Sequence, residues 1–109
     1  MKQLTHHECV RADTALSKAF GLLGKRWTAV VLGTLGVGGP TGFRELSRAV
    51  GGISDSVLSD RLTELTQAGL VTRTVDEGPP ISVTYALSER GAALMPAFAQ
   101  ISTWAQEHL

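Results

Sequence analysis

The stretch "GGISDSVLSDRLTELTQAGLV", from Gly51 to Val71, decides the fold that we predict for this chain. A pair of glycines precedes Ser54, and serine favours the N-cap of a helix because its hydroxyl oxygen accepts a hydrogen bond from a free N–H group of the first turn. Gly69 stands where a C-cap glycine belongs, because glycine adopts the left-handed backbone that ends many helices. The stretch therefore predicts a helix over about residues 54–68.

The two faces of this helix differ in chemistry. Leucines recur every three or four residues and form a narrow stripe that should pack on the preceding helix: Leu58, Leu62 and Leu65. Short polar side chains gather on the opposite face: Ser56, Ser59, Asp60, Thr63 and Gln67. This second face is left for solvent or for a ligand.

The neighbouring segments predict a supporting helix and a hairpin. "FRELSRAV", residues 43–50, predicts a short helix with Arg44 and Arg48 outward, and the glycine pair makes the turn after it. Its inward positions are expected to be Phe43, Leu46, Ala49 and Val50. Downstream, "LVTRTVD" (70–76) and "ISVTYALS" (81–88) alternate and are rich in β-branched residues, so they predict a hairpin whose rigid tip contains "EGPP".

The N-terminal part predicts two further helices. "ALSKAFGLLG", residues 15–24, favours a short helix that Asp13 or Thr14 caps and that Gly24 ends. "KRWTAVVLGTLG", residues 25–36, favours a buried helix. The inward positions of that helix follow helical spacing: Trp27, Val30, Val31 and Thr34 or Leu35. We expect "GVGGPTG" to be a loop that leads to the supporting helix.

The C-terminal stretch "SERGAALMPAFAQISTWAQEHL" predicts a helix over about residues 88–108, with Ser88 as a possible cap. Its apolar positions recur at helical spacing: Leu94, Phe98, Ile101, Ala105 and Leu109. Pro96 either kinks this helix or marks a break in it.

Length and composition indicate one globular domain over residues 1–109, since 43% of the 109 residues are hydrophobic and 18% are charged. Ten basic residues balance ten acidic ones, so any contact with nucleic acid must depend on local charge. The longest apolar run is too short and too rich in glycine for a membrane helix, and the polar start shows no signal-peptide pattern. We therefore expect a cytoplasmic protein, at the nucleoid, without contact to a membrane.

Two short helices joined by a tight turn and followed at once by a hairpin are typical of a winged helix-turn-helix. This order of elements predicts a mainly α fold with a small β-hairpin, of the α+β class. In such folds the second helix enters the major groove of DNA. A helix-turn-helix pattern alone is only moderately specific, because other three-helix cores share it.

Several segments together resemble the HxlR-type transcriptional regulators, a MarR-like winged-helix family of bacteria. They are "LLGKRWTAVVLGTL", "FRELSRAVGGISDSVLSDRLTELTQAGLVTR" and "PPISVTYALSERGAAL", with a cysteine near the N-terminus. The resemblance covers nearly the whole chain. It implies a homodimer that binds a palindromic operator in double-stranded DNA as a repressor or activator. It also implies dimer contacts from the N- and C-terminal helices and a response to electrophiles or oxidants through the cysteine.

Carried onto this sequence, the resemblance makes residues 54–68 the recognition helix and residues 71–87 the wing. Ser54 is then expected to hold a phosphate at the positive end of the helix, while arginines of the supporting helix grip backbone oxygens. The polar face of the recognition helix should reach base edges. The candidate DNA-binding residues are Arg44, Arg48, Ser54, Ser56, Ser59, Asp60, Arg61, Thr63, Arg73 and Pro80.

This chain departs from the family pattern at two places. The family commonly carries "S-P-R/K-V" at the start of the recognition helix, where this chain has "SDSV" with Asp55 and Ser56. The wing also lacks its usual arginine at the tip. Lys25, Arg26 and Arg61 are alternative sources of positive charge, although Arg61 is equally placed for a salt bridge with an acid of its own helix, Asp60 or Glu64.

Cys9 is the only cysteine of the chain, a few residues ahead of the first predicted helix and close in sequence to basic residues. Nearby positive charge and a helix N-terminus favour the thiolate form, so Cys9 is the candidate redox sensor. The alternative is a thiol packed at the dimer interface without a regulatory role. A metal site made of His6, His7 and Cys9 is not favoured, because no second cluster of ligands accompanies it.

The sequence also bears on other classes of function. The chain has no glycine-rich phosphate loop and no evident catalytic pair, so we expect neither an enzyme nor a bound cofactor. A small-molecule pocket between the terminal helix and the core is an alternative to redox sensing, with candidate lining residues Phe20, Trp27, Phe98 and Trp104. A winged helix that binds protein and no DNA is the other alternative, because the net charge is zero and acids stand at Asp55, Asp76 and Glu77.

Overall fold

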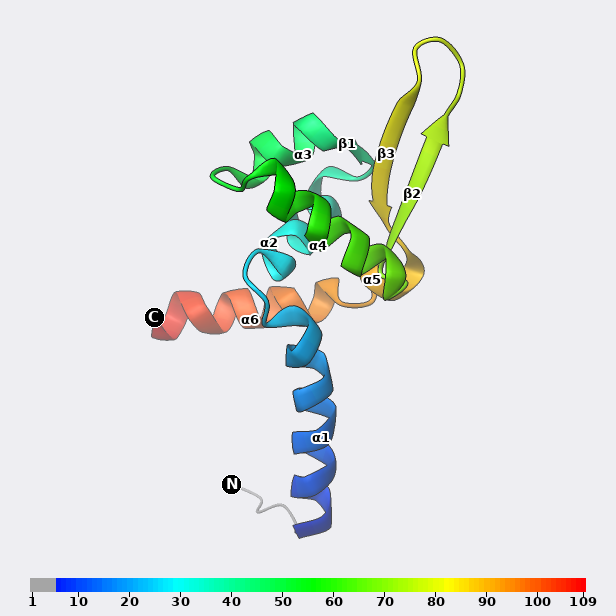
Figure 1. The fold of residues 1–109 in the computed structure, drawn as a ribbon. Coiled ribbons are helices and arrows are strands. Elements are labelled where there is room, and N and C mark those ends of the chain that lie inside the picture. Colours follow the sequence, from blue (N-terminus) through cyan, green and yellow to red (C-terminus); the bar gives the residue numbers. More distant parts are fainter. Residues whose placement is uncertain (1–5) are drawn as a thin grey trace.

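The computed structural model describes the chain from residue 6 to residue 109, with the backbone alone described for residues 6–13. A helical body carries a long hairpin on one side, and the two terminal helices run away from it (Figure 1). In chain order the elements are α1 (His6–Leu23), α2 (Thr28–Gly38), β1 (Thr41–Gly42), α3 (Phe43–Val50), α4 (Asp55–Gln67), β2 (Val71–Asp76), β3 (Ser82–Leu87), α5 (Glu89–Ala92) and α6 (Met95–His108).

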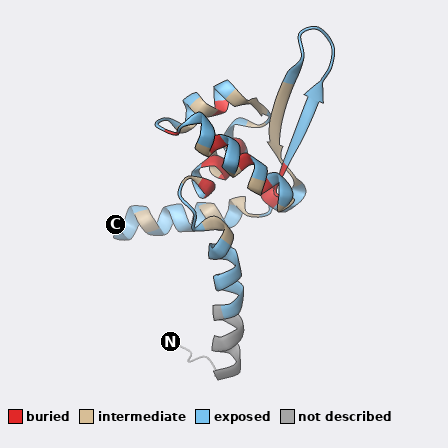
Figure 2. Ribbon diagram, in the orientation of Figure 1, coloured by how far each residue is buried: buried red, intermediate tan, exposed pale blue. Residues whose placement is uncertain are grey.

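The core lies where α2, α3 and α4 meet, as the buried segments in Figure 2 show. The leucine stripe of α4 is buried there, with 0% exposure of Leu58 and 1% of Leu62 and Leu65, so this prediction is confirmed. The fully buried partners from the other two helices are Val31, Leu32, Leu35 and Leu46. Apolar burial on one stripe leaves the opposite side of α4 outside the body.

The turn between α3 and α4 depends on the predicted glycine pair. Gly51 and Gly52 have φ angles of 73° and 75°, a left-handed backbone that other residues rarely adopt. Ile53 then enters the core, and the Ser54 hydroxyl accepts a hydrogen bond from the N–H of Val57 at 3.2 Å. The predicted N-cap is confirmed, and α4 begins at the next residue.

The hairpin follows directly from the end of α4. Gly69 has a φ of 78°, and the Leu70 N–H donates to the Leu65 carbonyl at 3.0 Å, which closes the helix as predicted. β2 and β3 pair antiparallel from Val71 opposite Leu87 to Asp76 opposite Ser82. The short strand β1 adds to the other edge of β3, so the strand order is β1-β3-β2.

The expected loop "GVGGPTG" is wrong at both of its ends. Helix α2 continues through the glycines to Gly38, and Thr41–Gly42 forms strand β1. A strand of two residues is too short to show alternation in the sequence, because pairing with β3 alone creates it. In α2, Val30 is 51% exposed, contrary to the expected inward position, and in α3 Ala49 is exposed as well.

The first helix is longer than its sequence suggested. We expected a start at Asp13 or Thr14, but α1 begins at His6, because no glycine or proline interrupts the chain between His6 and Phe20. The helix ends as predicted, and the Gly24 N–H donates to the Phe20 carbonyl at 2.8 Å. Cys9 therefore lies within α1 and not ahead of it.

The C-terminal segment is two helices rather than one. The Ser88 hydroxyl caps α5 by accepting from the Gly91 N–H at 3.1 Å, and α5 ends at Ala92. α6 begins at Met95 with Pro96 in its first turn, where the missing N–H of proline costs no hydrogen bond. Pro96 thus marks a break, and the expected continuous helix over residues 88–108 is corrected.

Candidate nucleic-acid interface

The polar side of α4 is uncovered. We call its exposed residues the polar face of α4: Ser56, Ser59, Asp60, Thr63 and Gln67. All five side chains are exposed in the described chain, and exposed segments recur along α4 in Figure 2. A rigid helix that is buried on one side and open on the other is the geometry that a major groove admits.

The hydroxyl groups on this face differ in whether their protons are available for a hydrogen bond to a ligand. The Thr63 hydroxyl donates to the Ser59 carbonyl at 2.9 Å, so its proton is already used. Thr63 consequently offers its methyl group and its oxygen lone pairs, which suit a thymine methyl group or a base amino group. Ser56 and Ser59 have no such side-chain bond among those that the structure records, and their hydroxyls can donate as well as accept.

Arg44 reaches the start of α4, as expected for a residue of the supporting helix, but it meets an acid there. Its guanidinium lies 3.1 Å from the Asp55 carboxylate, and both side chains are exposed, at 78% and 57%. Exposed ion pairs contribute at most about 1 kcal/mol, so a phosphate can compete for Arg44. Arg48 is exposed, and it makes no ion pair within the described part of the chain.

Arg61 forms an ion pair within its own helix. Its guanidinium lies 2.7 Å from the Glu64 carboxylate, and its side chain is only 17% exposed, so the ion-pair alternative is confirmed. Lys25 donates to the same carboxylate at 2.9 Å. Hydrogen bonds from Lys25 and Arg61 hold the pKa of Glu64 below its ordinary value. These pairs tie the second half of α4 to the turn between α1 and α2.

The wing is exposed from Thr72 to the tip. Asp76 accepts a hydrogen bond from the Gly78 N–H at 3.1 Å, so this acid shapes the tip itself. Pro80 is exposed in the same tip. Arg73 lies on β2 directly opposite Tyr85 of β3, which places both side chains on one face of the hairpin.

A cleft of about 340 Å³ separates α4 from this face of the hairpin. It is lined by Ser59, Leu62, Thr63, Thr66, Gln67, Arg73 and Tyr85. Tyr85 was missed as a site residue because its alternation in the sequence shows only that it belongs to a strand. The strand register, which places Tyr85 opposite Arg73, was the signal that could have found it.

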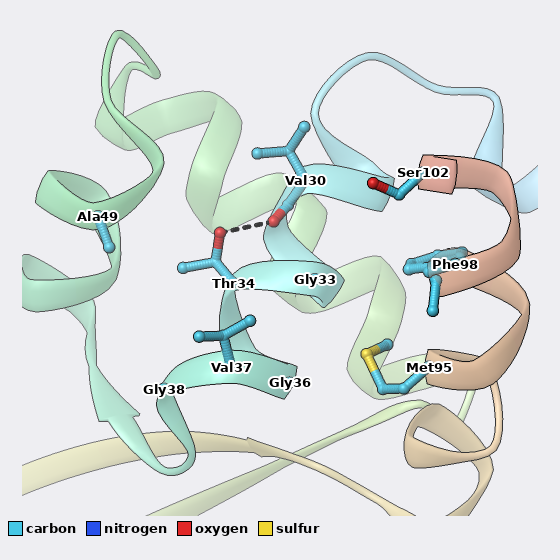
Figure 3. Close-up of a pocket in the computed structure, with 11 residues that line it drawn as sticks. Val30, Gly33, Thr34, Gly36, Val37, Gly38, Ala49, Met95, Phe98 and Ser102 are labelled. Atoms are coloured by element: carbon cyan, nitrogen blue, oxygen red, sulfur yellow. Dashed lines mark hydrogen bonds between the residues drawn. The ribbon is translucent and has the colours of Figure 1, made fainter. Parts of the chain in front are cut away.

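A second, apolar hollow lies between α2 and α6 (Figure 3). It measures about 750 Å³ and is lined by Val30, Gly33, Thr34, Gly36, Val37, Gly38, Ala49, Met95, Phe98, Ala99 and Ser102. Met95 packs directly over Gly36, where any Cβ would collide with its sulfur. An adjoining hollow of about 440 Å³ reaches Phe20 and Ile101.

Two of the four residues expected around a ligand pocket line these hollows, namely Phe20 and Phe98. Trp27 instead packs against the core, and Arg26 lies over its ring at 5.2 Å from the centroid. Trp104 packs against His108, with ring centroids 5.8 Å apart.

Two predictions concern side chains that lie outside the described ones. They are the redox role of the Cys9 thiol and the metal site of His6, His7 and Cys9, which was not favoured. Among the side chains that are described, none form a cluster suited to a metal ion. No helix in the described range is long and apolar enough to cross a membrane.

A family model described as the HxlR-like helix-turn-helix matches residues 22–109. The chain is 38% identical over 92 residues to the HTH-type transcriptional regulator YodB of Bacillus subtilis, which covers 84% of this chain and 81% of YodB.

Solved structures of such proteins have the same fold. The reduced form of YodB has a TM-score of 0.78 at 37% identity, covering 86% of this chain and 91% of that one. A protein described as a MarR-family regulator of Enterococcus faecalis has a TM-score of 0.79 at 32% identity, with 87% and 86% covered. The reduced form of the redox regulator HypR has a TM-score of 0.75 at 26% identity, with 85% and 91% covered. The winged helix-turn-helix predicted from the sequence is confirmed.

Proposed function

The chain is a transcriptional regulator of the HxlR-like helix-turn-helix family, and from this premise we propose that it binds double-stranded DNA with the polar face of α4. The observation that carries the proposal is the uncovered state of that face on a capped, well-packed helix. Ser56, Ser59, Asp60 and Thr63 contact base edges, while the N-terminal end of α4 at Ser54 faces a phosphate.

The backbone contacts of the proposal come from the flanking elements. Arg44 and Arg48 of α3 bind phosphates beside the start of α4, and Arg73 and Pro80 bring the wing to the neighbouring stretch of the duplex. Arg61 takes a supporting part, because its guanidinium is paired with Glu64 of the same helix, and Glu64 in turn accepts from Lys25 outside α4. Phosphate contacts of this kind fix the position of the protein on DNA and make its affinity depend on salt.

The proposal includes a homodimer. Leu16 and Phe20 of α1 are 55% and 54% exposed, on a helix that runs away from the body (Figure 1), and Ile101 of α6 is 50% exposed. Single helices with so much open apolar surface are only marginally stable in water. A second copy packed on α1, α6 and the apolar hollow between α2 and α6 covers these residues. The twofold axis then presents two α4 helices to a palindromic operator with half-sites about 34 Å apart.

The effector in this proposal acts at Cys9. Oxidation or alkylation of the thiol within α1 changes the packing of α1 against its dimer mate and, through it, the spacing of the two α4 helices. The fold shared with the redox regulator HypR supports this route. Loss of operator binding on oxidation gives a repressor that releases its genes under oxidant or electrophile stress.

The apolar hollow between α2 and α6 favours one competing candidate, a regulator that responds to a small apolar ligand. Replacement of Cys9 by serine separates the two. If Cys9 is the sensor, diamide releases the parent protein from its operator and leaves the Cys9→Ser variant bound. Release of both proteins by the oxidant contradicts the role of Cys9.

The DNA-binding proposal is tested by titrating a labelled duplex, taken from upstream of the protein's own gene, with the full chain at several salt concentrations. We expect tight binding whose affinity falls steeply between 50 and 200 mM salt, by about tenfold or more, because phosphate contacts release counterions. A winged helix that binds only protein shows no affinity for this duplex or for a random one at low salt.

A further inference from the structure

We propose that the cleft between α4 and the hairpin is a seat for one phosphate of the DNA backbone, built by Arg73 and Tyr85 together with Ser59 of α4. The inference rests on the proposed function, assigns Tyr85 a role in it, and gives Ser59 a backbone phosphate in place of the base edge named above. It also specifies the ligand of Arg73 as a phosphodiester and places that ligand between the helix and the wing.

Strand register brings the two hairpin side chains together. Arg73 and Tyr85 are directly opposite each other in the antiparallel pair of β2 and β3, so their side chains leave the same face of the hairpin. Both line the 340 Å³ cleft, whose other wall is the part of α4 from Ser59 to its end at Gln67. Tyr85 is half-buried, whereas Arg73 is exposed.

The chemistry of the lining selects an anion. None of the seven residues around the cleft is an aspartate or a glutamate. Unlike Arg44 and Arg61, Arg73 makes no ion pair with any acid in the described part of the chain. A guanidinium can only donate hydrogen bonds, so Arg73 is left with its full set of donors for a ligand.

The hydroxyl groups of the lining narrow the choice of donors further. Thr66 donates its hydroxyl proton to the Leu62 carbonyl at 2.7 Å, just as Thr63 donates to Ser59. Within the described part of the chain the hydroxyls of Ser59 and Tyr85 make no hydrogen bond, so they are free to donate. One guanidinium and two free hydroxyls among the residues that line an acid-free cleft suit the oxygens of a phosphate.

The position of the cleft indicates that this phosphate belongs to DNA. When α4 lies in the major groove and the hairpin reaches along the duplex beside it, the strand between them crosses the space that separates the two elements. A phosphate held there contacts the helix and the wing at once. It therefore fixes their common register on the duplex, a role that carries no sequence information of its own.

Three variants of the full chain test the seat: Arg73→Gln, Tyr85→Phe and the double variant. Each is titrated by fluorescence anisotropy against an operator duplex and a random duplex, at several salt concentrations. We expect each single variant to weaken binding to both duplexes by about tenfold, the worth of a charge-assisted hydrogen bond or two. Arg73→Gln should also reduce the steepness of the salt dependence by about one phosphate per protomer.

The double variant should be weaker than either single variant but by less than the product of their effects, because the two side chains share one phosphate. Arg90→Gln is the matched control for loss of one positive charge, since Arg90 lines a different hollow beside Leu70 and Ala93. It should bind as the parent does. Thermal melting shows whether each variant is folded, and exposed Arg73 gives a readout even if Tyr85→Phe unfolds.

If Arg73→Gln and Tyr85→Phe are folded and bind both duplexes as tightly as the parent does, the proposal of a phosphate seat is wrong and the proposed function stands. Failure of the parent itself to bind any duplex overturns the proposed function instead. Inorganic phosphate distinguishes the sources of the anion. In one outcome, inorganic phosphate raises the melting temperature of the parent but not that of Arg73→Gln, while both variants bind DNA like the parent. In that case the cleft binds free phosphate, and the proposed DNA seat is wrong.

Discussion

At the scale of single residues, the start of α4 balances opposite charges. Arg44 binds a phosphate in the proposed complex, whereas in the chain alone its guanidinium lies 3.1 Å from the Asp55 carboxylate. Asp55 also stands next to Ser56, where the family commonly has proline followed by a basic residue. An acid near the helix N-terminus helps the helix, through its dipole, but repels the DNA backbone. Asp55 therefore favours folding of α4, and we expect it to limit the affinity for DNA that we propose.

We predict that Asp55→Asn binds an operator duplex about threefold to tenfold more tightly than the parent, because Arg44 is released and one negative charge is removed from the interface. Anisotropy titrations at 50 and 200 mM salt measure this, and the gain should shrink at the higher salt concentration. Glu89→Gln, on α5, is the control for removal of an acid outside the interface. Unchanged or weaker binding by Asp55→Asn speaks against the placement of Arg44 beside a phosphate.

At the scale of elements, helix α4 was predictable from the sequence, but strand β1 and the ion pairs that join α4 to other elements were not. Its cap at Ser54, its leucine stripe and its closing glycine at Gly69 are local signals, and all are found as predicted. Strand β1 depends on pairing with β3 across a long stretch of chain, so no local pattern announces it. The hydrogen bond from Lys25 to Glu64 and the pair of Arg44 with Asp55 likewise join residues that come together only through the packing of the helices, whereas the pair of Arg61 with Glu64 follows from their spacing on α4.

The pairs at Glu64 make the attachment of α4 sensitive to acid. The pKa of Glu64 is lowered in the folded chain by hydrogen bonds from Lys25 and Arg61. A lowered pKa means that the charged carboxylate stabilises the fold above the ordinary pKa of glutamate, and that this stabilisation is lost as the pH falls through the lowered value. Urea unfolding of Glu64→Gln and of the parent should therefore differ more at pH 7 than at pH 3.

Glu77→Gln is the control for loss of a carboxylate. Glu77 lies at the hairpin tip, and its carboxylate forms no ion pair in the described chain. An equal difference between parent and Glu64→Gln at both pH values would show that the carboxylate of Glu64 contributes nothing as a charge.

At the scale of the whole molecule, the chain is more extended than a compact domain of its length. Its radius of gyration is 16.4 Å, whereas a compact domain of about 100 residues has about 13 Å. The excess comes from α1 and α6, which project from the body and carry exposed apolar residues (Figure 1). This arrangement is expected of half of a dimer.

Sedimentation equilibrium should give the parent about twice the chain mass of 11.5 kDa. Phe20→Asp and Ile101→Asp place a charge on the apolar surfaces of α1 and α6, so each should shift the protein to the monomer and weaken operator binding at least about tenfold, since one half-site alone is then bound. Thr72→Asp, on the exposed hairpin, should leave the mass unchanged. A monomeric parent contradicts the dimer.

The claim on which the account depends is that the polar face of α4 lies against DNA. Ser56→Glu tests it most directly, because a carboxylate in the first turn suits the helix dipole and keeps the fold, yet places negative charge in the groove. The measurement is the affinity for an operator duplex at 100 mM salt, with Ala92→Glu on exposed α5 as the matched control. The account predicts that Ser56→Glu loses specific binding by about a hundredfold while Ala92→Glu binds like the parent. Equal affinity of the two folded variants would contradict it.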